Sequence, residues 1–205
     1  MFGQANELSH AVEPGNCPQR AAPTIIQTNT GRYETMPQQM IWFFTSIAMS
    51  FAAWGLVTAR YIWPRLRDRP RAEALQPLLM LHCFRFIGLA FIVPGVVSID
   101  LPAGFAIPAA YGDLIAAVFA IATLLLLPKT AGFAAAWAFN VWGFADILDA
   151  FYQANRNGLL AGQLGATFFL PTLIVPLLLI THVVQFRILI RHRSVSPIGQ
   201  QTLHA

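Results

Sequence analysis

The chain has 205 residues, of which 56% are hydrophobic and only 11% are charged. Soluble globular domains carry roughly 25% charged residues, so this composition indicates a membrane protein and argues against an ordinary soluble fold. The formal net charge is +4, but most cations flank apolar runs instead of forming a basic patch, which argues against a nucleic-acid-binding protein. The two cysteines, Cys17 and Cys83, have the spacing of neither a disulfide framework nor a metal site.

Residues 1–38 are polar, rich in Pro, Gln, Thr and Asn, and without hydrophobic periodicity. This composition predicts a flexible N-terminal tail. No apolar core follows a basic start, so the stretch does not have the pattern of a secretory signal peptide. Met36 or Met40 could be the true start of translation, and the tail would then be an artefact of start-site choice. A short basic tail is expected at 191–205.

Five apolar segments follow the N-terminal tail and predict an all-α fold, a bundle of five transmembrane helices. They cover 40–62, 77–98, 111–128, 131–152 and 166–190, within one transmembrane domain at 39–190. All except the third approach the roughly 20 residues that a helix needs to cross a bilayer. The third could be extended by the Ala-Gly-Phe-Ala-Ile-Pro-Ala-Ala stretch that precedes it.

The cations between the segments predict an orientation. If five helices alternate in direction, these cations fall on one side: Arg65, Arg67, Arg69, Arg71, Lys129, Arg191 and Arg193. The positive-inside rule makes that side cytoplasmic. We therefore expect an outside N-terminus, a cytoplasmic C-terminus and a multi-pass protein of the cell membrane, which is the inner membrane in a Gram-negative cell.

Two similar polar groups interrupt apolar segments. Leu-His-Cys-Phe-Arg-Phe places His82 and Arg85 one turn apart, and Thr-His-Val-Val-Gln-Phe-Arg places His182, Gln185 and Arg187 in another segment. With the second segment starting near residue 77 and the fifth ending near residue 187, each histidine lies roughly 7–8 Å along its helix from the basic side. Both histidines are therefore expected at one depth, in the cytoplasmic half.

Three interpretations of these residues remain open. The two imidazoles could hold a b-type haem, with Arg85 and Arg187 near its propionates. The same side chains, with Gln185, could line a pocket for a quinone-like or other amphipathic small molecule. They could also be structural, bonding one another and the helix backbones while Arg187 extends to the headgroups. Because a charge is costly about three turns from the interface, Arg85 is expected to pair with a carboxylate or another anionic group.

An acidic cluster is expected on the outer side. It comprises Asp146 and Asp149 in the fourth segment and Asp113 near the outer end of the third. Carboxylates that lie close together could bind a cation or share a proton. Alternatively, Asp113 and Asp149 are solvated at the interface, and only Asp146 needs a partner, supplied by Arg156 or an outward-facing hydroxyl.

These patterns predict a membrane bundle that binds a small molecule or cofactor between the second and fifth helices. The alternative is a small proton-coupled transporter that uses Asp146 and Asp149, with helices kinked at Pro171 and Pro176. A third possibility is a non-catalytic accessory subunit of other membrane proteins. The chain has no glycine-rich phosphate loop and no H-E-x-x-H motif, no metal site is predicted, and enzymatic activity is left undecided.

Overall fold

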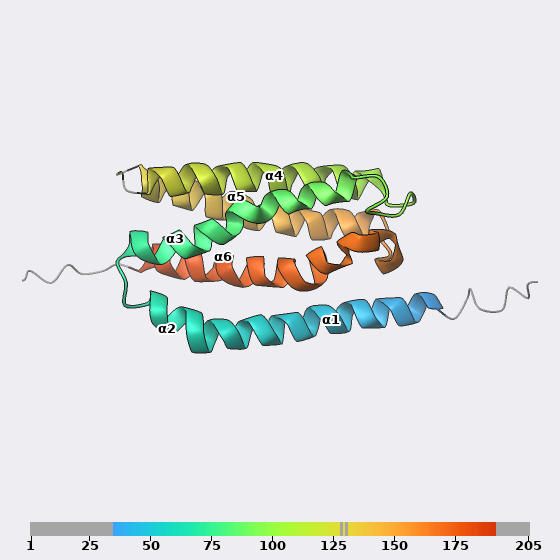
Figure 1. Cartoon of the computed structure of the whole chain (residues 1–205), viewed down its shortest axis with the longest axis horizontal. Helices are drawn as coiled ribbons and strands as arrows, with labels where there is room; N and C mark the ends of the chain where they lie inside the picture. The colour runs from blue at the N-terminus through green and yellow to red at the C-terminus, as the bar shows by residue number, and fades with distance from the viewer. Residues whose placement is uncertain (1–34, 128, 130, 192–205) are drawn as a thin grey trace, which may run out of the picture.

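Helices account for the regular structure of the chain. The computed structural model describes residues 35–127, 129 and 131–191, and within them it has no β-strand beyond an isolated bridge between Pro94 and Val97. The helices run side by side in one elongated bundle (Figure 1). This confirms the predicted all-α fold. Most of the two predicted tails, together with Cys17 and Arg193, lies outside the described residues.

The described elements form five rods. They follow one another as α1 (Thr35–Val57), η1 (Thr58–Ile62), α2 (Trp63–Leu66), α3 (Arg71–His82), η2 (Cys83–Ile92), α4 (Ala103–Leu126), α5 (Gly132–Arg156), η3 (Ala161–Phe168), η4 (Leu170–Ile174) and α6 (Val175–Ile190). The first rod joins α1, η1 and α2, the second joins α3 and η2, and the last joins η4 and α6. The elements η1 and η4 are wide π-helical turns, while η2 and η3 are 3₁₀ helices.

Four of the rods are long and apolar enough to cross a membrane. They are Gln38–Leu66, Arg71–Ile92, Ala103–Leu126 and Leu170–Ile190. The fifth rod, α5, has 25 residues but is not among these four. Its apolar residues are interrupted by Asn140, Asp146 and Asp149. Four of the five predicted segments are therefore supported by both length and composition.

Helices continue through two prolines, which makes the predicted start of the second segment wrong and confirms the extension considered for the third. The second rod begins at Arg71 and runs through Pro77, and α4 begins at Ala103 and runs through Pro108. A proline lacks the amide donor of a helix interior, so in the sequence Pro77 indicated the start of the second segment. At about 1.5 Å per residue, His82 lies about 16 Å from the start of its rod. It is near the middle of the rod, deeper than predicted.

The second rod also ends earlier than predicted, at Ile92 instead of residue 98. The Pro94-Gly95 pair lies in the turn that follows, where Gly95 has a positive φ of 82°. The amide of Ala166 donates a hydrogen bond of 2.8 Å to the carbonyl of Val96, which ties this turn to η3. Pro94 and Gly95 therefore close the rod instead of kinking it.

The core has two apolar halves with a polar layer between them. One half includes Leu75, Leu79, Phe139 and Ile188, and the other includes Phe91, Phe105, Ala109 and Leu164. Along each rod except α1, polar side chains occupy the stretch between these halves. The fully or almost fully buried ones are His82, Arg85, Asn140, Thr181, His182 and Gln185.

Candidate functional site

A change of helix type positions the central residue of the polar layer. After His82 the chain tightens from an α-helix to the 3₁₀ helix η2, which has about three residues per turn. Residues three apart then share one face, and η2 buries Arg85, Gly88 and Phe91. His82, three residues before Arg85, continues the same line. The rod thus directs an imidazole and a guanidinium into the bundle from adjacent turns.

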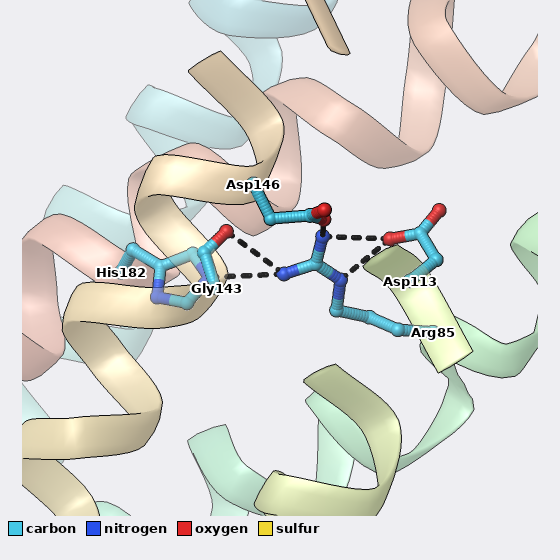
Figure 2. Close-up of polar contacts among 5 residues, drawn as sticks. All are labelled: Arg85, Asp113, Gly143, Asp146 and His182. Carbon is cyan, nitrogen blue, oxygen red and sulfur yellow. Dashed lines mark hydrogen bonds and ion pairs between the residues drawn. The ribbon is translucent and has the colours of Figure 1, made fainter. Parts of the chain in front are cut away.

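Arg85 is 2% exposed, and its partners come from three other helices (Figure 2). Its Nε donates to Asp113 Oδ1 at 2.7 Å, and its Nη2 lies 2.6 Å from both Asp113 Oδ1 and Asp146 Oδ2. Its Nη1 donates to the carbonyl oxygen of Gly143 at 3.0 Å and lies 3.5 Å from Nε2 of His182. A guanidinium has five N–H groups. These five contacts leave no donor for a further partner.

Two carboxylates face this one guanidinium, so the cluster has one acidic group in excess. The second oxygens, Asp113 Oδ2 and Asp146 Oδ1, have no hydrogen-bond donor within the described part of the chain. They pack against Gly88 and Gly112, where a Cβ atom would collide with them. The side chains of Asp113 and Asp146 are 19% and 13% exposed. With both carboxylates ionised, the cluster therefore offers free acceptors and no free donor.

The two histidines extend the cluster toward α6. Nδ1 of His182 lies 2.6 Å from Oδ1 of Asn140, whose Nδ2 donates to the backbone carbonyl of His182 at 3.3 Å. An amide oxygen only accepts, so Nδ1 of His182 carries the hydrogen and its Nε2 is an acceptor facing Arg85. His82 Nε2 lies 3.0 Å from Thr181 Oγ1. These bonds fasten α3, α5 and α6 to one another.

The histidine pair does not fit the haem interpretation. The ring centres of His82 and His182 are only 4.2 Å apart, and both residues are fully buried. A metal bonded to two imidazoles lies about 2 Å from each nitrogen, which separates the ring centres by roughly 6 Å. A porphyrin plane would also have to pass between the rings. In the described residues, no group of three or more His, Cys, Asp or Glu side chains could hold a metal ion.

An apolar cavity of about 330 Å³ ends at the Arg85 cluster. Arg85, Asp113 and Asp146 form its polar end. The walls come from α1, η2, α4, α5 and the η3–η4 region. They include Phe43, Phe44, Phe91, Phe105, Ala109, Phe151, Leu159 and Leu164. Small-molecule sites are typically apolar clefts of about 300–1,000 Å³ with a few polar groups. The cavity has that size and that distribution of polarity.

The structure brings together residues that were predicted on opposite sides of the membrane. His82, Arg85 and His182 lie in one cluster with Asp113 and Asp146. Asp113 was expected near a helix end, but α4 includes the extension that begins at Ala103, which places this carboxylate about 15 Å along the helix. The predicted partner of Asp146 was Arg156 or a hydroxyl. This prediction is wrong, because the carboxylate of Asp146 pairs with Arg85.

Three predicted site residues lie apart from the cluster. Asp149 is exposed and accepts a hydrogen bond from Gln153. The guanidinium of Arg187 stacks on the ring of Trp63, at 4.1 Å from its centre. Gln185 is fully buried one turn beyond His182, and its amide oxygen and nitrogen have no partner among the described residues.

The predicted site omits several residues that shape the cluster: Asn140, Gly143, Thr181, Gly88 and Gly112. Asn140 carried a visible signal, because an amide within an apolar segment requires a partner. Two of the glycines gave a weaker indication in the sequence, since Gly88 lies three residues after Arg85 and Gly112 is adjacent to Asp113. Their role depends on contacts between rods, which periodicity does not reveal.

Comparison with known proteins gives a family without an assigned activity. Residues 42–190 match the family described as "Domain of unknown function (DUF8737)". The match extends over all five rods and includes every residue of the polar layer. No curated protein and no solved structure matches the chain.

Proposed function

The chain belongs to the DUF8737 family, and we propose that it is a membrane protein that binds an amphipathic small molecule in the cavity at the Arg85 cluster. One observation carries this proposal. An apolar cavity ends on two carboxylates that keep free oxygens, beside a guanidinium whose donors are all engaged. The ligand has an apolar body and a head group that donates hydrogen bonds or carries a positive charge.

The apolar body follows from the walls of the cavity. Phenylalanines from α1, η2, α4 and α5 surround the space, and few polar side chains reach it beyond the cluster. Burying apolar surface gives about 25 cal/mol per Å². A hydrocarbon or aromatic body therefore supplies most of the binding free energy, whereas the polar end selects the head group.

The head group follows from the count of donors and acceptors. A quinone presents carbonyl acceptors only, and at the Arg85 end of the cavity it would meet carboxylate oxygens without a free donor. A quinol presents two hydroxyl donors, and a long-chain amine presents a cation, so either group can bond Asp113 or Asp146. The quinone-like interpretation is thereby narrowed to the reduced form, or to a cationic amphiphile of similar size.

We also infer that α5 crosses the membrane together with the other four rods. Its 25 residues span about 37 Å, enough for a bilayer. Asp146 pairs with Arg85 and Asn140 with His182, so these polar groups face protein instead of lipid. The start of α1 and the end of α6 lie at opposite ends of the bundle (Figure 1). The positive-inside rule then makes the arginine-rich end cytoplasmic and the start of α1 external.

Proton-coupled transport is the second candidate, and the excess carboxylate favours it. One proton can balance the cluster of Arg85, Asp113 and Asp146, and release of that proton would change the charge at the end of the cavity. In this scheme Asp146 works with Asp113, because Asp149 is exposed and bonded to Gln153. Once a ligand is known, its uptake by proteoliposomes under a pH gradient tests this scheme, and Asp146→Asn should abolish the pH dependence.

The binding proposal is tested with purified protein in detergent. Decylbenzoquinol, its oxidised quinone and dodecylamine are added separately, and the shift in melting temperature is measured. We expect the quinol or the amine to raise the melting temperature and the quinone to have little effect. Asp146→Asn and the cavity-filling Ala109→Phe should reduce the shift, while Asp149→Asn, an exposed carboxylate on the same helix, should leave it unchanged.

Two results would contradict the proposal. One is the absence of a shift with both the quinol and the amine. The other is an equal loss in Asp149→Asn and Asp146→Asn, because the shift would then reflect general charge and not the cavity.

A further inference from the structure

A second groove lies beside the first rod, at the arginine-rich end of the bundle. It has a volume of about 400 Å³ and runs between α1–η1 and α6. Its walls include Phe51, Gly55, Leu179 and Val183, and Arg187 lies among its lining residues. The cavity proposed for the small molecule has none of these lining residues. The groove is therefore a separate feature, apolar along most of its length with a cation at one end.

Two cations at this end, Arg187 and Arg191, have no carboxylate partner among the described residues. Arg187 and Arg191 both lie over the ring of Trp63, at 4.1 and 5.3 Å from its centre. Neither forms a salt bridge with a carboxylate in the part of the chain that the structure describes. A guanidinium on an indole face is held in position while its edge stays available for hydrogen bonds. The groove thus ends at an ordered positive charge.

An unpartnered hydroxyl lies in the groove wall. Thr58 is 7% exposed and lines the groove, and its Oγ1 has no hydrogen-bond partner among the described residues. A helical threonine normally bonds a carbonyl three or four residues earlier. Thr58 is the first residue of the π-helical turn η1, and there that bond is absent. A buried hydroxyl without a partner is unfavourable, so an occupant that bonds it gains affinity.

We propose that this groove binds an anionic phospholipid, with the phosphate at Arg187, one acyl chain along Gly55 and Phe51, and the polar glycerol-ester region near Thr58. From residue 51 to residue 63 the rod rises about 18 Å. One leaflet of a bilayer has about 15 Å of hydrocarbon. The groove is therefore about as long as the hydrocarbon of one leaflet is thick, so it holds the headgroup end and the upper part of one acyl chain.

Charge complementarity selects this occupant over a second copy of the chain. Two copies inserted in the same direction would place their arginine-rich ends side by side. A symmetric contact through this groove would then bring Arg187 and Arg191 of each copy toward those of the other. An anionic headgroup removes that repulsion, and basic pockets between helices are typical of phospholipid binding.

The experiment compares phosphatidylglycerol with phosphatidylcholine carrying the same acyl chains. Each lipid is added to the full-length protein in detergent, retained lipid is counted by native mass spectrometry, and the melting temperature is recorded. Inorganic phosphate is a third condition, which separates a lipid site from a site for free anions. We expect phosphatidylglycerol alone to be retained and to raise the melting temperature.

Two variants and one control locate the site. Arg187→Gln removes the cation, and Gly55→Leu fills the groove without a clash, since a Cβ at Gly55 meets no atom within 4 Å. Each should reduce phosphatidylglycerol retention at least fivefold. Arg65→Gln removes an exposed arginine at the same end that does not line the groove, and it should retain the lipid as the parent does.

Four results would overturn the lipid proposal. They are equal retention of the two lipids, an equal stabilisation by inorganic phosphate, full retention in Arg187→Gln, and a dimer that Gly55→Leu dissociates in lipid-free detergent. None of them bears on the quinol and amine titrations, which concern the other cavity.

Discussion

The excess carboxylate beside Arg85 makes a quantitative prediction about stability. Asp113 Oδ1 and Asp146 Oδ2 each lie 2.6 Å from the same Nη2, so the two oxygens are no more than 5.2 Å apart. At an effective dielectric constant of 20, two unit charges at that separation repel by about 3 kcal/mol. Asp113→Asn or Asp146→Asn removes that repulsion together with one attractive pair. We therefore expect each single variant to lose only about 1–2 kcal/mol of unfolding free energy.

Loss of the guanidinium has no such compensation. Arg85→Leu leaves two carboxylates facing each other in a buried site, and removal of one partner of a buried pair typically costs about 3–5 kcal/mol. The double variant Asp113→Asn/Asp146→Asn strands the guanidinium instead. Its loss should exceed the sum of the two single losses by about 1–3 kcal/mol, the usual range for residues in one network.

The assay is equilibrium unfolding in mixed micelles, followed by circular dichroism, with Asp149→Asn as the control for an exposed carboxylate. An Arg85→Leu variant that is no less stable than the single aspartate variants would contradict this prediction. Additive losses for the two aspartate substitutions would also contradict it, because the cluster would then not act as one charge-balanced unit.

Three further predictions concern packing, hydrogen bonding and topology. Gly143→Ala should lose about 1–3 kcal/mol of unfolding free energy, because its Cβ would lie 2.7 Å from His182 Cε1 and 2.9 Å from Arg85 Nη1. Gly55→Ala is the control. A Cβ at Gly55 meets no atom within 4 Å, so this variant should lose no stability. Asn140→Leu should lose about 1–3 kcal/mol of unfolding free energy, because it leaves Nδ1–H of His182 without an acceptor. Asn140→Asp keeps an acceptor and should lose less in the same unfolding assay. Reporter fusions to the two chain ends should locate them on opposite faces of the membrane, whereas both ends on one face would contradict five crossings.

Much of the fold follows from the distribution of apolar residues. A chain with long charge-poor runs must satisfy its backbone within each run, and helices do so. The need of Arg85 for an anionic partner follows in the same way, from the cost of a charge within an apolar segment. The sequence does not identify the partner, because that depends on where each rod begins. The third segment was predicted from residue 111 with an extension left open, and the helix begins at Ala103, which carries Asp113 to its middle.

The detailed geometry of the site is harder to predict from the sequence than the fold. The switch to a 3₁₀ helix after His82 aligns Arg85 with the cluster, and nothing in the apolar periodicity indicates it. Gly88 and Gly112 matter because carboxylates from other helices lie where their side chains would be. Such contacts join residues 25 or more positions apart in the chain, and they arise only when the rods pack.

The polarity of α5 follows from the same packing. On insertion scales, an aspartate at the centre of a helix costs about 2.5–3.5 kcal/mol, so a helix with Asn140 and Asp146 is a poor membrane segment by itself. In the bundle, Asp146 meets Arg85 of η2 and Asn140 meets His182 of α6, and each polar group loses its exposure to lipid. Hydropathy assigns the free-energy cost of these polar groups to α5 alone. In the bundle they pair with polar groups of η2 and α6 that would also be costly in lipid. The polar residues that make α5 a poor membrane segment by itself are therefore the ones that hold it to the other helices, and one of them, Asp146, also lies at the end of the cavity.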